Sequence, residues 1–455
     1  MEPERIALLN DEPPAEGRRY VLYWMQAAQR AACNHALEHA IALADRRREP
    51  LLVAFGLMDD YPEANLRHYR FMLEGLAETA ASLAGRGIRF VLRKGHPAEV
   101  ALALAQDASL VVCDRGYTRH QRAWRRQVAT EAGRQVIEVE GEVVVPVETA
   151  SAKAEIAART LRPKILRLRE HFLQPLAESR PAVPSLDLPV RGDLDPVDVE
   201  GNLAALGLDR SVPPTCRFKG GTAEARARLD RFLARKLRGY RDARSDPSLR
   251  QSSALSPYFQ FGQISPVEVA LRVVAATPAA DPDRAAFLEE LIVRRELAHN
   301  LVWHRPDDYD RYEGLPAWAR RSLDLHRNDP RPRTYGIEEL EAGRTHDRYF
   351  NAAAREMRIT GYMHNYMRMY WGKRIIEFTR TPEEAYATAL TLNNRHFLCG
   401  RGPNAFANVA WLFGRHDRPW MERPIFGQVR YMNDRGLQRK FDIEAYVRWT
   451  ERLEE

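Results

Sequence analysis

FLEELIVRRELAHNL, residues 287–301, and GRHDRPWMERPIFGQVRYMN, residues 414–433, are the two segments that reveal most about this chain. Each mixes arginine, glutamate, histidine and aromatic residues more densely than the packed face of an ordinary helix does. A third unusual segment, RMYWGKR at residues 368–374, lies between them. Together they indicate functional surfaces in the C-terminal half rather than core packing alone.

The N-terminal part of the chain alternates short apolar runs with Ala- and Leu-rich helical stretches such as residues 36–46 and 70–83. The apolar runs are typical of strands buried on both faces; they cover residues 19–24, 51–57, 88–92, 110–113 and 135–139. This alternation predicts an open, doubly wound parallel sheet of the Rossmann-like kind.

The C-terminal part has helical spacing in almost every long segment. The clearest predicted helices cover residues 223–239, 266–276, 283–303, 351–378 and 382–393. Residues 149–218 are rich in proline and lack a clear period, which predicts a linker. We therefore expect an α/β domain over residues 1–148, this linker, and an all-helical domain over residues 219–455.

Composition limits the classes of protein that fit. The chain has 455 residues, 45% of them hydrophobic and 29% charged, as in globular proteins. No apolar run approaches ~18 residues, and the N-terminus shows no signal peptide, so we expect a cytoplasmic protein without contact to a membrane. The four cysteines are far apart, which disfavours a disulfide framework or a metal site. The net charge of +7 mildly favours a polyanionic partner.

The segments at residues 287–301, 368–374 and 414–433 closely resemble the most distinctive blocks of the class II cyclobutane pyrimidine dimer (CPD) photolyases. The resemblance runs from about Val21 to Trp449. It implies an antenna-type α/β domain followed by an all-α FAD-binding domain. It also implies a deoxyribodipyrimidine photo-lyase, a carbon–carbon lyase that repairs dimers in double-stranded DNA in the light. Photoexcited reduced FAD would pass an electron to the flipped-out dimer, and we expect the enzyme to act as a monomer.

A serine-rich stretch, SSALSPYFQFGQIS at residues 252–265, offers hydroxyl and backbone N–H donors suited to phosphate oxygens. From the residues alone, a loop that caps a helix is the favoured interpretation. The resemblance assigns FAD binding to a larger set: Tyr240, Ser252, Ser253, Leu255, Ser256, Arg294, Asn365, Arg368, Asn393 and Cys399.

Four residues carry the expected catalytic roles. The resemblance implies that Glu290 faces the dimer, Met369 touches it, Trp411 stacks on it and Asn393 faces flavin N5. By spacing alone, Glu290 and Arg294 are four residues apart, share a helical face and can form a surface ion pair. Trp411 could also be a core residue. Met363, Met367 and Tyr370 form an apolar stripe that we assign to the core.

The chain departs from the family pattern near the flavin. Cys399 replaces a usual aspartate that pairs with the arginine matched by Arg368, and Gly402 replaces a usual acid. Of three tryptophans that relay electrons to the flavin in the family, only the one matched by Trp371 remains. Phe350 and Phe378 stand at the other two positions.

Basic and aromatic residues crowd the C-terminal region, as DNA-backbone contact requires. A solvated basic face is the alternative. We predict DNA binding by Arg415, Arg418, Trp420, Arg423, Arg430, Tyr431, Arg435 and Lys440; His416 and Arg439 lie in the same cluster.

Polar residues also follow the first predicted strand, where open α/β sheets hold ligands. Gln26, Gln29, Arg30 and Asn34 could bind an antenna chromophore, a deazaflavin or similar, or could simply cap a helix. Two other functions stay open: a cryptochrome-like flavin photoreceptor without repair activity, and a DNA-binding protein that has lost its flavin.

Overall fold

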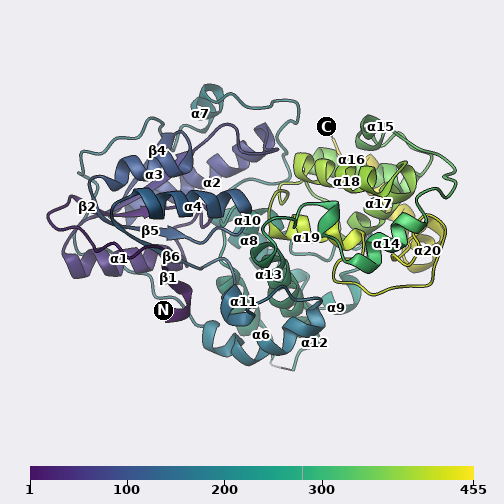
Figure 1. The fold of residues 1–455 in the computed structure, drawn as a ribbon, viewed down its shortest axis with the longest axis horizontal. Coiled ribbons are helices and arrows are strands. Elements are labelled where there is room, and N and C mark those ends of the chain that lie inside the picture. Colours follow the sequence, from purple (N-terminus) through teal and green to yellow (C-terminus); the bar gives the residue numbers. More distant parts are fainter. Residues whose placement is uncertain (279, 455) are drawn as a thin grey trace.

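A six-stranded sheet forms the core of the N-terminal part in the computed structural model, which describes residues 1–278 and 280–454 (Figure 1). The strand order is β1-β6-β5-β2-β3-β4. Every pairing is parallel except that of β1 with β6. The strands are β1 (Ile6–Leu8), β2 (Tyr20–Trp24), β3 (Leu51–Leu57), β4 (Arg89–Lys94), β5 (Ala108–Asp114) and β6 (Gln135–Val139).

Helices cover both faces of this sheet, which confirms the doubly wound prediction. Helix α1 (His35–Arg47) and the end of α2 (Leu66–Gly85) pack on one face, and α3 (Pro97–Ala105) and α4 (Arg119–Glu131) on the other. Strands β2, β3 and β5 are buried along their whole length, as expected for apolar runs covered on both sides. The sequence did not predict β1, a short edge strand that lacks a strong apolar pattern.

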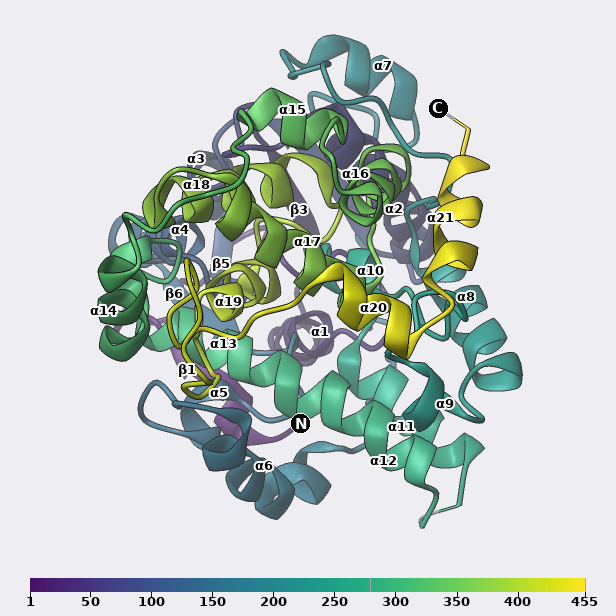
Figure 2. The same cartoon turned by 90° about the vertical axis from the view of Figure 1, so that its right-hand side faces the viewer.

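From α8 onward the chain is helical and forms a second unit beside the sheet (Figures 1 and 2). Its elements are α8 (Thr222–Arg235), α9 (Tyr240–Ala243), α10 (Ser256–Gln260), α11 (Pro266–Ala276), α12 (Pro282–Leu288), the π-helical η2 (Glu289–Arg294), α13 (Arg295–His304), η3 (Tyr312–Gly314), α14 (Ala317–Leu325), α15 (Ile337–Ala342), α16 (Arg348–Thr360), α17 (Asn365–Phe378), α18 (Pro382–His396), α19 (Pro403–Leu412), α20 (Asp434–Lys440) and α21 (Ile443–Glu451).

The prediction of one helix over residues 351–378 is wrong. Helix α16 ends at Thr360 and is followed by Gly361, whose φ of +64° is the left-handed conformation that commonly terminates helices. Helix α17 begins anew after His364, whose side chain accepts a hydrogen bond from the backbone N–H of Tyr366. The break brings Met363 to the wall of the cavity described below while it stays 1% exposed.

Residues 149–218 contain regular structure that the sequence did not predict. Helix α6 (Ala158–Phe172) packs into the helical unit, with Leu161 and Ile165 fully buried there. Helix α7 (Val199–Ala205) packs against α2 of the sheet unit. This stretch therefore lies across both units. Within the described residues, no helix is long and apolar enough to cross a bilayer.

Candidate active site

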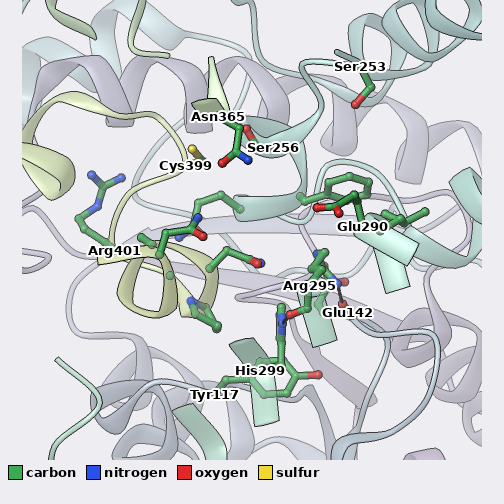
Figure 3. A pocket seen from close by; sticks show the side chains of 18 of the residues that line it. Tyr117, Glu142, Ser253, Ser256, Glu290, Arg295, His299, Asn365, Cys399 and Arg401 are labelled. Atoms are coloured by element: carbon green, nitrogen blue, oxygen red, sulfur yellow. Dashed lines mark hydrogen bonds between the residues drawn. The ribbon is translucent and has the colours of Figure 1, made fainter. Parts of the chain in front are cut away.

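A cavity of about 290 Å³ lies in the helical unit, beside the sheet unit (Figure 3). Its walls come from α9, α10, the η2–α13 segment, α17 and the start of α19. The sheet unit closes one side through residues such as Tyr117 and Gln121. Seven residues predicted from the sequence line it together: Tyr240, Ser253, Ser256, Glu290, Asn365, Arg368 and Cys399.

The serine loop leaves hydroxyl groups facing this cavity. Ser256 is the first residue of α10, and no side chain caps that helix. Helix α11 is capped by Ser265 instead. The hydroxyl of Ser252 lies 3.2 Å from that of Tyr362, which also lines the cavity. The helix-capping alternative therefore does not account for Ser253 and Ser256.

The opposite part of the cavity holds polar residues that the sequence analysis missed. Arg295 Nη1 donates to the Glu142 carbonyl oxygen over 2.6 Å, and Arg30 pairs with Glu142 Oε1 at 2.5 Å. Glu142 Oε2 and Arg295 Nε have no hydrogen-bond partner among the described residues. Tyr117 and His299 pack edge to face, with ring centroids 4.7 Å apart.

Burial shapes the charges of this group. It raises the pKa of Glu142 and lowers that of Arg295. The two buried atoms without partners favour a polar ligand, because an unsatisfied buried polar group is costly. Arg295 lies within the distinctive segment 287–301, which was the only signal for it. Glu142 belongs to a loop of the sheet unit whose approach to α13 no local pattern predicts.

The ion pair that the spacing of Glu290 and Arg294 allows does not form. Residues 289–294 form a π-helix, in which partners five apart are aligned, so Arg294 Nε instead lies 3.1 Å from Glu289 Oε1. Glu290 is free to line the cavity, where its Oε1 lies 2.9 Å from Arg244 Nη1. Arg294 is half-exposed and does not line the cavity.

Cys399 and Arg368 are in contact at the cavity wall. The Arg368 guanidinium lies 3.8 Å from the centroid of the Phe397 ring, and its Nη2 is 3.5 Å from Cys399 Sγ. The ring and the thiol thus take the place of the acid expected in the family. Behind Phe397 lies the buried Trp371, at 6.3 Å between centroids. Across the cavity stand Glu290 and Arg295 (Figure 3).

Five other residues predicted to bind the flavin or the dimer lie outside the cavity wall, one of them Ser252 of the serine loop. Leu255 is a buried residue of the serine loop, and Met369 is half-buried on α17. Asn393 is buried and donates from Nδ2 to Asn394 Oδ1 over 3.0 Å, while its own Oδ1 has no partner within the described residues. Trp411 is half-buried and packs against the main helical core.

The predicted DNA-binding residues differ in how free their charges are. Arg418, Arg423, Arg435 and Lys440 are exposed on α20 and the loop before it, which face the viewer in Figure 2. Arg415, by contrast, is half-buried and donates to the Gly314 carbonyl oxygen. The remaining members are Trp420, which is 38% exposed, Tyr431, under the guanidinium of Arg423, and Arg430, which pairs with Asp417.

A second cavity, of about 110 Å³, opens at the carboxyl end of the sheet. Gln26 and Gln29 line it, as expected for ligand-facing residues. Arg30 and Asn34 do not: Arg30 pairs with Glu142, and Asn34 caps α1 by accepting from the backbone N–H of Leu37. For Asn34 the capping interpretation is therefore confirmed.

A doubly wound sheet joined to a helical unit with a polar cavity is the architecture of photolyases. The overall structure is similar to that of a bacterial class III photolyase from Agrobacterium tumefaciens, with a TM-score of 0.74, 20% identity, and 96% and 87% of the two chains covered. This likeness shows the fold.

Sequence comparison is more specific. The profile of the DNA photolyase family matches residues 21–183. A deoxyribodipyrimidine photo-lyase of Methanothermobacter thermautotrophicus is 48% identical over 98% of this chain and 97% of its own length. One from Potorous tridactylus is 40% identical over 98% of this chain and 84% of its own. The chain belongs to the DNA photolyase family.

Proposed function

We propose that this protein repairs cyclobutane pyrimidine dimers in DNA in a light-dependent reaction, with FAD held in the 290 Å³ cavity. One observation carries the proposal. The cavity gathers the hydroxyls, the arginine and the glutamate that the sequence assigned to flavin and dimer, in a chain 48% identical to a deoxyribodipyrimidine photo-lyase. A monomer acting on duplex DNA in the cytoplasm is part of the same proposal.

The residues present fit FAD. Ser253, Ser256 and Tyr240 offer hydroxyl groups to a pyrophosphate, and the unpartnered Glu142 Oε2 and Arg295 Nε await polar groups of a ligand. When bound in its reduced form, FAD supplies upon illumination the electron that opens the cyclobutane ring and takes it back afterwards.

Glu290 and Arg244 would act on the dimer itself. Their side chains are 31% and 33% exposed and joined at 2.9 Å at the cavity wall, so a substrate can reach both. Glu290 would hydrogen-bond the bases of the dimer. The Arg244 guanidinium beside it would favour negative charge developing on those bases, because a fixed cation needs no reorganisation during the reaction.

Trp411 would form the wall against which the dimer stacks. Photolyases extrude their target nucleotides, and a dimer is already poorly stacked, so its extrusion costs less than that of normal bases. An indole face then offers ~1–3 kcal/mol of stacking per base. We further propose that the second cavity, next to Gln26 and Gln29, holds an antenna chromophore, a deazaflavin or similar.

Cysteine alkylation tests where FAD binds. Cys399 lines the main cavity, whereas Cys216 is exposed, does not line the cavity and serves as the internal control. Adding FAD to flavin-stripped protein should slow alkylation of Cys399 and leave that of Cys216 unchanged. If bound FAD slowed alkylation of both cysteines equally, or slowed alkylation of neither, FAD would bind elsewhere.

A repair assay then separates the functions. Protein with reduced FAD should remove dimers from a damaged duplex in light and not in darkness. Bound flavin without repair would favour a cryptochrome-like photoreceptor. A protein that binds DNA but no flavin would have lost its cofactor.

A further inference from the structure

Cations and indole rings alternate in a series that runs from the interior of the helical unit to its surface. Lys373 Nζ lies 5.4 Å from the centroid of the Trp411 ring. The Arg430 guanidinium carbon lies 5.3 Å from that ring and 4.2 Å from the Trp420 ring. The Arg418 guanidinium carbon lies 5.2 Å from the Trp420 ring. The series runs from the buried Lys373 to the exposed Arg418, and each step is an attractive cation–π contact.

The Asp417 carboxylate holds members of this series in place by hydrogen bonds. Asp417 accepts hydrogen bonds from Arg430 Nε and Nη2, at 2.8 and 3.0 Å. It also accepts from the backbone N–H of Arg418 at 2.9 Å and from Trp420 Nε1 at 3.4 Å. Its side chain is only 8% exposed. Burial would raise the pKa of Asp417, but hydrogen bonds, chiefly from Arg430, hold it below its ordinary value.

The inner end of the series is fixed as well. The Lys373 ammonium is fully buried and donates to the carbonyl oxygen of Leu412, the last residue of α19. Burial lowers the pKa of Lys373 to about 7. Trp411 therefore contacts both the buried Lys373 Nζ and the Arg430 guanidinium.

We infer that Asp417 is a positioning residue that determines how well the protein distinguishes damaged from undamaged DNA. Through Arg430 it fixes Trp411 and Trp420 as a preformed surface for bases displaced at a lesion. This inference rests on the proposed function, in which Trp411 faces the dimer. It also gives Arg430 another role than the phosphate contact predicted from the sequence, because its guanidinium is already bound to Asp417 and to two rings.

Electrostatics alone predicts a different outcome for removing Asp417. A carboxylate on a DNA-binding surface repels phosphate, so losing it should tighten binding to every duplex. If Asp417 positions the rings, losing it should weaken binding to damaged DNA and leave undamaged DNA bound as well as before or more tightly. The two explanations differ in the sign of the effect.

The test compares dissociation constants for a dimer-containing duplex and the undamaged duplex of the same sequence, measured in darkness on flavin-loaded protein. Asp417→Asn should raise the constant for the damaged duplex about two- to thirtyfold, the range of one or two lost cation–π contacts. The constant for the undamaged duplex should stay equal or fall. Asp417→Glu, which keeps the charge, should recover part of the discrimination.

Asp434→Asn is the matched control, because Asp434 is an exposed acid on α20 in the same basic region. It should tighten binding to both duplexes equally. If Asp417→Asn behaves like this control, the inference is wrong. Should Asp417→Asn fail to fold, Arg430→Lys decides: it keeps the charge and loses the planar group. Unchanged discrimination in Arg430→Lys overturns the inference. A parent protein that does not prefer damaged DNA contradicts the proposed function instead.

Discussion

Glu289 and Glu290 are neighbours that the π-helix directs to different partners. Substitutions of the two residues should therefore affect repair differently. Glu289 binds Arg162 and Arg294 outside the cavity, whereas Glu290 lines it beside Arg244. Glu290→Ala should leave FAD binding and DNA affinity nearly unchanged and lower the yield of repair per absorbed photon. Losing a charged hydrogen-bonding group at a developing anion costs about 1.5–3 kcal/mol.

Glu289→Ala provides the control for that measurement, since it removes an adjacent carboxylate of the same helix. Repair yield would be followed as loss of dimers per photon in fully reduced protein. Equal yields in Glu290→Ala and the parent would show that Glu290 does not contact the dimer. A matching loss in Glu289→Ala would point to damage to the π-helix.

At the scale of single elements, Glu296 on α13 joins the two units of the protein. Its carboxyl accepts hydrogen bonds from the backbone N–H groups of Val144, at 2.6 Å, and Val145, at 3.3 Å. Burial raises the pKa of Glu296 to about 8, above its ordinary value near 4.5. The folded protein therefore keeps a proton that the unfolded chain releases between these values, and stability contributed by Glu296 is lost as pH rises from about 4.5 through 8.

Glu296→Gln should remove that dependence, because the amide does not ionise while its oxygen still accepts from Val144. Thermal melts at pH 5.5 and 8.5 would measure it. At the higher pH the mutant should be more stable to unfolding than the parent. The gain should be roughly 1.4 kcal/mol per unit of difference between the folded and unfolded pKa of Glu296. Glu99→Gln, on the exposed side of α3, should show no such gain. Parallel curves for Glu296→Gln and the parent would mean that Glu296 is already ionised in the folded state.

The sequence predicted strands and helices correctly where burial alone determines them. The predictions failed where a contact between residues distant in sequence determines the structure. The apolar runs of β2, β3 and β5 are covered on both faces, so their pattern sufficed. The break at Gly361 was hidden inside a continuous helical pattern. Glu142 reaches the cavity only because the sheet unit packs against α13. The resemblance supplied Tyr240, Ser253 and Ser256 but not the partners of Glu290 and Arg368.

Helices α16 and α17 carry Phe350 and Phe378, which the resemblance places at two positions of the family's electron relay. Phe350 and Phe378 are buried with ring centroids 5.6 Å apart, and Phe378 lies 5.2 Å from the half-buried Tyr335. Phenylalanine is much harder to oxidise than tryptophan. We therefore expect slow photoreduction of the oxidised protein, together with good repair after chemical reduction.

Phe350→Trp combined with Phe378→Trp should speed photoreduction, followed as bleaching of the oxidised flavin absorption in light. Larger rings in a packed core cost ~1–3 kcal/mol, so a melting curve must accompany the measurement. Trp371→Phe should abolish the gain. Rapid photoreduction in the parent that persists in Trp371→Phe would show a different electron route.

At the scale of the whole molecule, the net charge is only +7, but the positive charge is distributed unevenly. Arg418, Arg423, Arg435 and Lys440 are exposed together on α20 and the preceding loop. Phosphate contacts release counterions, so the logarithm of the binding constant should fall with the logarithm of salt concentration by ~0.9 per contact. We expect about five contacts or fewer, since Arg415 and Arg430 are held by the protein itself.

Arg435→Ala should weaken damaged and undamaged duplexes alike and reduce the slope of this salt dependence by about one contact. Trp411→Ala should instead weaken only the damaged duplex and leave the slope unchanged, because stacking releases no counterions. Arg126→Ala, an exposed arginine of α4 on the sheet unit, controls for net charge. An equal loss of slope in Arg126→Ala and Arg435→Ala would mean that DNA senses the overall charge and that α20 is no specific contact. If Trp411→Ala distinguished damaged from undamaged DNA as well as the parent, Trp411 would be a core residue without a role in lesion recognition.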